Sequence, residues 1–346
     1  MTSRAPVHLA DQGYFWIGVE LAAAENGLVV DGTALYVEYQ IPERQTQPYP
    51  LVFIHGGGAQ GLDWMSTPDG RPGWRTLALQ AGYAVYVVDR PGHGRATGTA
   101  AADRWTPTVD GLGAMFSGGT NPAATQWPGT GEPDDLMIAT VLAGASAGIP
   151  AQAEHHRVMR LRGAQLLDRI GPAVVIANSA GCGPAWLMGD ARPELVRAIV
   201  ALEPLSPSMS WAIAESPMSY DPPVSGETEL GLFDAASAPA DAAASSLFPA
   251  GPPPMYRQPE PARRLSQLAL VPLAIVTGEA SFATALDPAT VDYLRRAGCQ
   301  VDHLRLGDLG INGNGHLAML EKNNADVLAV VLEWVQRRTR TSPTDN

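Results

Sequence analysis

The sequence predicts an α/β fold in which a mostly parallel central sheet is covered by helices on both faces. Short apolar runs alternate along the chain with segments of helical character. Strands that are apolar throughout are typical of parallel sheets buried on both faces. Three of these runs end at a polar residue, namely His55, Asp89 and Glu203. Such sheets bind ligands at the carboxyl ends of their strands, so we expect a site at that edge.

Each element follows from its local pattern. The alternation of Leu35, Val37, Tyr39 and Ile41 indicates a half-buried first strand. The expected strands are 33–41, 51–54, 83–88, 173–177, 196–202, 273–276 and 301–306. The expected helices are 74–81, 180–188, 288–297 and 325–336. The third of these helices has Pro288 in its first turn and ends at Gly298.

The length of 346 residues suits one large domain with insertions or two small domains, and we predict a single domain spanning residues 1–346. Of these residues 45% are hydrophobic and 17% charged, which allows a sizeable core. Two stretches, at about 95–148 and 204–261, are rich in Pro, Ala, Gly, Ser or Thr. Each begins just after the carboxyl end of an expected strand. We interpret both as cap or lid insertions, with flexible surface loops as the alternative.

Charge and composition exclude some partners. A formal net charge of −12 disfavours nucleic acid, which binds mainly through Lys and Arg, and disfavours anionic membrane surfaces. We find no apolar run long enough to span a bilayer and no secretory leader, so we expect a cytoplasmic protein. Cys182 and Cys299 are expected as buried thiols rather than a bridge. A homodimer is compatible with the sequence, which leaves the oligomeric state open.

The segment 173–183 has the pattern of a nucleophile elbow. An apolar run leads to Ser179, and a helix-compatible segment follows it. The sharp turn requires small residues two positions before and after the serine, and these are Ala177 and Gly181. The pattern usually has glycine at both positions, so Ala177 departs from it. Ser179 is therefore the candidate nucleophile.

A serine hydroxyl needs a base, and the base needs an orienting acid. His316 is the candidate base, because it is the one histidine between the last strand and the last helix. The usual position of the acid, three residues after Gly278, is occupied by Ser281, which cannot serve. Glu203, directly after strand 196–202, is favoured as the acid. Glu279 and Asp287 remain as alternatives.

The glycine run at 56–58 follows strand 51–54 and can turn its N–H groups toward a substrate. We expect the N–H groups of Gly57 and Ala180 to form an oxyanion hole, with Gly58 in reserve. The motif 89–95 is expected to form a structural turn at the border of the site. His155 and His156 are adjacent, which makes them a poor ligand pair, and we expect both at the surface.

With the elbow, the 55–58 loop, the 89–95 turn and His316 in register, the chain resembles the α/β-hydrolase fold superfamily from about Leu35 to the terminal helix. Segments 13–18 and 34–42 also resemble the bacterial esterase 713 family. A glutamate after the strand that follows the nucleophile is similar to that family's acid, so the resemblance implies Glu203. A member of the family carries paired cysteines where this chain has Gly57 and Gly58.

We therefore expect a serine hydrolase that cleaves a carboxylic ester, lactone or thioester through an acyl-enzyme, without metal or organic cofactor. A small-molecule ester is the expected partner. The alternatives are an acyltransferase or amide hydrolase on the same fold, and a binding protein with a degenerate site. Epoxide hydrolases and haloalkane dehalogenases are disfavoured because both use an aspartate where Ser179 stands. The insertions contain apolar residues that are expected either to line a substrate pocket or to pack inside the lid: Trp105, Phe116, Trp127, Met209, Trp211 and Tyr220.

Overall fold

The computed structural model describes residues 6–96, 108–109, 113, 116–117, 121–132, 134–145, 152–204, 218–224, 227–231, 233–234 and 256–340. Its main sheet has eight strands: β1 (Leu9–Ile17), β4 (Leu35–Pro42), β5 (Leu51–Ile54), β6 (Val85–Asp89), β7 (Ala173–Asn178), β8 (Val196–Leu202), β13 (Leu273–Thr277) and β14 (Val301–Arg305). The helices are α1 (Trp74–Gln80), α3 (Leu136–Ala143), α4 (Gln152–Ile170), α5 (Cys182–Ala191), α7 (Asp287–Arg296) and α8 (Asn324–Thr339).

The sheet is mostly parallel, as the sequence predicts. The strand order is β1-β4-β6-β5-β7-β8-β13-β14. Neighbouring strands from β6 to β14 pair in parallel, whereas β4 is antiparallel to both β6 and β1. The strand β7 lies in the middle, between β5 and β8. The segments that follow these three strands therefore emerge side by side at one edge of the sheet.

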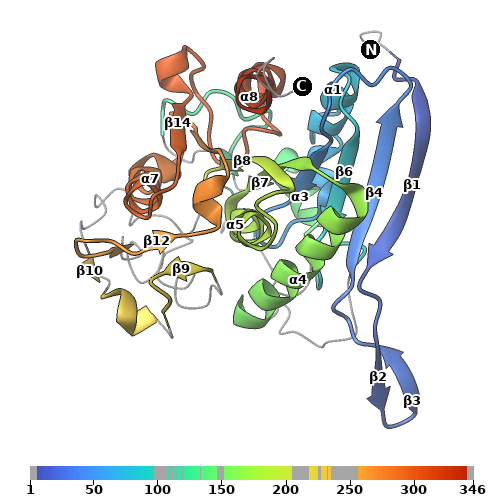
Figure 1. The fold of residues 1–346 in the computed structure, drawn as a ribbon. Coiled ribbons are helices and arrows are strands. Elements are labelled where there is room, and N and C mark those ends of the chain that lie inside the picture. The colour runs from blue at the N-terminus through green and yellow to red at the C-terminus, as the bar shows by residue number, and fades with distance from the viewer. Residues whose placement is uncertain are drawn as a thin grey trace.

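Helices cover both faces of the sheet (Figure 1). The helices α4, α5 and α7 contribute to one hydrophobic cluster, and α1, α3 and α8 contribute to the other. Residues of β7 alternate between the two clusters: Val175 belongs to the first, and Val174 and Ile176 to the second. Every residue of β7 is buried. This two-sided burial explains why the central strands are apolar without alternation.

The expected strands and helices are present, with ends that differ by a few residues. The prediction missed β1, the hairpin of β2 (Leu21–Ala24) and β3 (Gly27–Val30), and α4. The edge strand β1 pairs on one side only and leaves large side chains exposed, such as Tyr14 at 66% exposure. Its sequence therefore lacks the strong apolar pattern of a buried strand. The β2–β3 hairpin projects from this edge of the molecule (Figure 1).

Much of the two predicted insertions lies outside the described residues, including Trp105, Met209 and Trp211. Their described parts include α3 and the short strands β9 (Tyr220–Asp221), β10 (Phe233–Asp234) and β11 (Tyr256–Arg257). The strand β9 pairs with β12 (Arg264–Leu265), and β10 pairs with β11. The division into one domain with two caps stays a prediction. No described helix is long and apolar enough to cross a membrane.

The close contact between α4 and α5 predicts that adding a methyl group at Gly163 destabilises the protein. A Cβ added at Gly163 would lie 2.3 Å from Cγ of Met188, which is buried. We expect Gly163→Ala to lower the free energy of unfolding by about 1–3 kcal/mol, measured by urea denaturation. The double variant Gly163→Ala/Met188→Ala should lose less stability than the two single variants together. Strictly additive losses would show that the two positions do not clash.

Candidate active site

Ser179 lies on a sharp turn between β7 and α5. The backbone of Ser179 has a φ of 51°, in the left-handed region that non-glycine residues rarely adopt. A 3-10 turn, η2 (Ser179–Gly181), connects the strand to the helix. A Cβ at Gly181 would lie 2.3 Å from the carbonyl oxygen of His55. The turn therefore packs so closely against the loop after β5 that position 181 requires glycine. The methyl group of Ala177 is fully buried in the core, so glycine is not required there.

Glu203 follows β8 and contacts the predicted base. Its Oε2 lies 2.6 Å from Nδ1 of His316, and both residues are buried. The backbone N–H of Gly278 donates to Oε1 at 2.8 Å, and the hydroxyl of Ser281 donates to Oε2 at 2.5 Å. Glu203 has a φ of 48°, and it and Ser179 are the two described non-glycine residues with positive φ. Backbone strain of this kind costs about 1–3 kcal/mol and is concentrated at functional sites.

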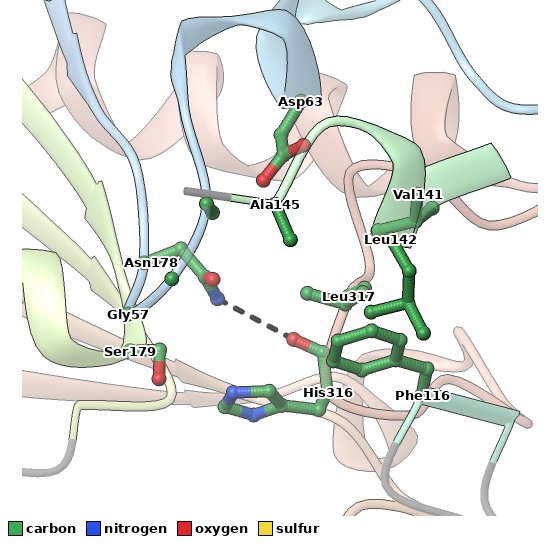
Figure 2. A pocket seen from close by; sticks show the side chains of 13 residues that line it. Gly57, Asp63, Phe116, Val141, Leu142, Ala145, Asn178, Ser179, His316 and Leu317 are labelled. Carbon is green, nitrogen blue, oxygen red and sulfur yellow. Dashed lines mark hydrogen bonds between the residues drawn. The ribbon is translucent and has the colours of Figure 1, made fainter. Parts of the chain in front are cut away.

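His316 lies in the loop between β14 and α8, and its imidazole points toward Ser179 (Figure 2). The loop is tied at both sides of the histidine. The backbone N–H of Gly315 donates to Glu321, and the carbonyl of His316 accepts from Nδ2 of Asn178 at 3.4 Å. In the tautomer whose Nδ1–H donates to Oε2 of Glu203, the other ring nitrogen of His316, Nε2, is an acceptor.

The two alternative acids have other partners. Oε2 of Glu279 accepts a hydrogen bond from the backbone N–H of Gly313 at 3.0 Å. Asp287 is buried and accepts from the hydroxyl of Thr277 at 2.5 Å. Burial and the nearby charge of Glu203 raise the pKa of Asp287 well above its usual value. Of the three candidates, Glu203 is thus the carboxylate that contacts His316.

Sequence reasoning missed the part that Ser281 plays. Its hydroxyl donates to Glu203 and also caps a 3-10 turn by accepting from the N–H of Ala283. Its position, three residues after Gly278, is where an acid is usually found, and this position was the feature of the sequence that could have indicated the role. Here Ser281 occupies that position and donates a hydrogen bond to Glu203, which follows the neighbouring strand β8.

The glycine loop after β5 lies against the Ser179 turn. A Cβ at Gly56 would lie 3.3 Å from Cβ of Ser179, and one at Gly57 would lie 3.4 Å from Cβ of Ala180. Gly58 has a φ of 64°, which favours glycine. The two predicted oxyanion donors, Gly57 and Ala180, therefore belong to adjacent segments. Gly57 and Gly58 both line the same pocket as Ser179.

A buried network supports this loop from behind. Nη2 of Arg90 donates to the carbonyl of Gly56 at 2.6 Å, and the backbone N–H of Arg90 donates to Nε2 of His55 at 3.1 Å. Nη1 of Arg90 lies 2.9 Å from Nε2 of His155. Burial lowers the pKa of Arg90 to about 9. Burial and the charge of Arg90 lower the pKa of His93 to about 3. The network thus holds neutral imidazoles around one cation.

The expectation that His155 and His156 lie at the surface was wrong. They are 6% and 1% exposed, on the side of α4 that packs into the molecule.

Besides Arg90 and His93, the 89–95 turn contains residues with structural contacts, as expected. Asp89 accepts from the backbone N–H of Gly61 at 2.6 Å and from Nε of Arg95 at 2.6 Å.

The pocket in front of Ser179 and His316 is mostly apolar (Figure 2). Its lining residues are Gly56, Gly57, Gly58, Ala59, Asp63, Phe116, Val141, Leu142, Ala145, Asn178, Ser179, His316 and Leu317. Phe116 is thus a pocket residue. Trp127 and Tyr220 are buried elsewhere, where Trp127 donates to Asp135 and the hydroxyl of Tyr220 lies 2.8 Å from that of Tyr293.

Cys182 and Cys299 are both free and buried, as expected. In the part of the chain that the structure describes, no group of three or more His, Cys, Asp or Glu side chains could hold a metal ion.

Comparisons with known proteins agree with this architecture. The family described as alpha/beta hydrolase fold matches residues 49–246. A curated protein, the probable secreted lipase phiG from Fungal sp. (strain ATCC 74256), is 36% identical over 336 residues, which cover 88% of this chain and 86% of that protein. The solved structure of a novel bacterial esterase superposes with a TM-score of 0.68 at 22% identity. That match covers 98% of this chain and 99% of the other, and at this identity it shows the fold alone.

The lipase comparison corrects one expectation. The relative is named a secreted protein, which points to secretion and contradicts the prediction of a cytoplasmic protein. That prediction rested on two features of the given sequence, the lack of a leader-like apolar segment near residue 1 and the lack of an apolar run long enough to span a bilayer.

The buried histidines predict a pH dependence of stability. His93 in an unfolded chain binds a proton below its usual pKa of 6.5, whereas the folded protein binds it only near pH 3. Between these values the unfolded state holds more protons, so the free energy of unfolding rises with pH. From about pH 5 to about pH 6.5, His93 should contribute about 1.5 kcal/mol of this rise.

Urea denaturation at several pH values tests this. His93→Asn should show a shallower rise than the unaltered protein, and substitution of the exposed His8 by Asn is the control. Equal slopes for all three proteins would contradict the expected protonation behaviour of His93.

Proposed function

The chain belongs to the α/β-hydrolase fold family, and we propose that it is a serine hydrolase that cleaves carboxylic esters through Ser179, His316 and Glu203. The observation that carries the proposal is the 2.6 Å contact between His316 Nδ1 and Glu203 Oε2, with His316 and Ser179 lining one pocket. The names of a lipase relative and of an esterase with the same fold support an ester as the substrate class.

In the proposed reaction, Oγ of Ser179 attacks the carbonyl carbon of the ester, and Nε2 of His316 takes the hydroxyl proton. Glu203 holds the imidazole in the reactive tautomer and stabilises its charged form. The N–H groups of Gly57 and Ala180 donate to the oxygen that becomes negative. The proton on Nε2 passes to the departing alkoxide, which leaves as the alcohol, and the acyl group stays on Ser179.

The second half of the reaction releases the acid. His316 takes a proton from water, whose oxygen attacks the acyl-enzyme, and Ser179 recovers its proton as the carboxylic acid departs. The left-handed turn at Ser179 supports this role, because it presents the hydroxyl above the sheet edge. The apolar walls formed by Phe116, Val141 and Leu142 suit an acyl or alkyl chain.

We expect Ser179→Ala to abolish hydrolysis of p-nitrophenyl esters and labelling by a fluorophosphonate probe. The far-ultraviolet circular dichroism should stay unchanged, because alanine removes only the hydroxyl. Full activity in this variant would exclude Ser179 as the nucleophile, and an unlabelled native protein would favour a binding protein with a degenerate site. Partition of the acyl-enzyme between water and added alcohol distinguishes hydrolysis from acyl transfer.

Replacement of the acid tests the assignment of Glu203. Glu203→Gln should lower kcat by about 10³–10⁴-fold, because the amide no longer fixes the tautomer or the charge of His316. Glu279→Gln is the matched control. The carboxylate of Glu279 accepts a hydrogen bond from Gly313 and does not contact His316, so its replacement should reduce kcat far less. A larger loss in Glu279→Gln than in Glu203→Gln would assign the acid to the later strand.

A further inference from the structure

Asp63 is a carboxyl group in the pocket that the proposed reaction does not use. It lies in the short turn η1 (Gly61–Trp64), just after the glycine loop, and lines the same pocket as Ser179 and His316. In the view of Figure 2 its side chain lies at the other end of the pocket from Ser179, with the carboxyl group directed inward.

The carboxyl group of Asp63 has no compensating partner among the described residues. No described side chain or N–H donates a hydrogen bond to its oxygens, and the negative charge of Asp89 repels the ionised form. Burial, followed by this repulsion, raises the pKa of Asp63 to about 7. By contrast, Asp89 accepts from Gly61 and pairs with Arg95.

The other pocket walls do not supply a partner either. Apart from the atoms of the proposed reaction and Asn178, the lining consists of glycines and apolar side chains such as Phe116, Leu142 and Leu317. An ionised carboxylate in such surroundings is unfavourable unless a cation or hydrogen-bond donor meets it. The described residues therefore leave the carboxylate of Asp63 without a partner, and a bound molecule with a cation or a donor would supply one.

We propose that Asp63 is a specificity-determining residue that selects esters carrying a positively charged nitrogen group at the end of the pocket away from Ser179. This inference rests on the proposed function. The cation would contact the carboxylate while the apolar walls hold the chain that leads to the scissile bond. Discrimination follows because a neutral ester of the same shape leaves the carboxylate unpaired.

Two pairs of matched esters test the proposal. On the acyl side, p-nitrophenyl 6-aminohexanoate is compared with p-nitrophenyl heptanoate, in which a methyl group replaces the ammonium. On the alcohol side, butyrylcholine is compared with its carbon analogue 3,3-dimethylbutyl butyrate. The readout is the ratio of kcat/KM for the charged ester to kcat/KM for the neutral one. In at least one pair we expect the ratio to fall about tenfold or more in Asp63→Asn.

The ratio separates Asp63 from the reaction itself, because both esters of a pair use the same nucleophile and base. Asp63→Glu should restore the ratio in part. Asp308→Asn is the control for loss of one negative charge, since Asp308 is exposed and does not line the pocket. In the native protein the ratio should rise with pH around 7, as Asp63 ionises, and it should be flat in Asp63→Asn.

The outcomes distinguish the two proposals. Turnover of all four esters with no preference, or with a preference that Asp63→Asn leaves intact, overturns the role of Asp63 and leaves the proposed function standing. A ratio that falls equally in Asp308→Asn assigns the effect to net charge and also overturns it. Failure of the native protein to hydrolyse any of the four esters contradicts the proposed function and, with it, this inference.

Discussion

The buried contact between Glu203 and His316 is the interaction on which the geometry of the site depends. It joins the end of β8 to the loop before α8, two segments more than a hundred residues apart in the chain. A buried carboxylate is stable only when its oxygens are met by donors. Gly278, Ser281 and His316 supply three of them. The same contacts therefore stabilise the buried carboxylate and fix the position of the imidazole.

A second buried charge organises the other side of the pocket. The guanidinium of Arg90 reaches the carbonyl of Gly56, and its remaining contacts are imidazoles rather than a carboxylate. The loop thus has a buried support at the carbonyl group of Gly56. The proposed oxyanion donor Gly57 follows directly in the chain and lines the pocket. Gly181 completes the arrangement, because only the absence of a side chain lets the Ser179 turn approach His55.

The pocket next to these two networks has polar side chains at its two ends and apolar side chains between them. Ser179 and His316 lie at one end, apolar side chains form the walls, and Asp63 lies at the other end. Both oxygens of Glu203 accept hydrogen bonds from the protein. Among the described residues none donates to the oxygens of Asp63, and this difference is the reason for assigning its partner to a substrate.

The sequence by itself determined the parallel sheet, the order of the elements and the candidate residues at the strand ends. Apolar runs between helices leave few other ways to bury both faces, and Ser179, Glu203, His316 and the glycine loop each follow a strand. It did not reveal β1 or the burial of His155 and His156. An edge strand has a weak pattern, and the burial of a polar residue depends on partners distant in the chain.

Only the tertiary structure decided which carboxylate meets His316 and where Asp63 points. Glu203, Glu279 and Asp287 all come close to strand ends, and their spacing in the sequence does not state which oxygens face the imidazole. Hydrogen bonds from Gly313 and Thr277 engage two of them, and β8 brings the third to the histidine. The local sequence pattern indicates that a histidine base requires a nearby carboxylate. Contacts between segments that are distant in the chain decide which carboxylate lies next to it.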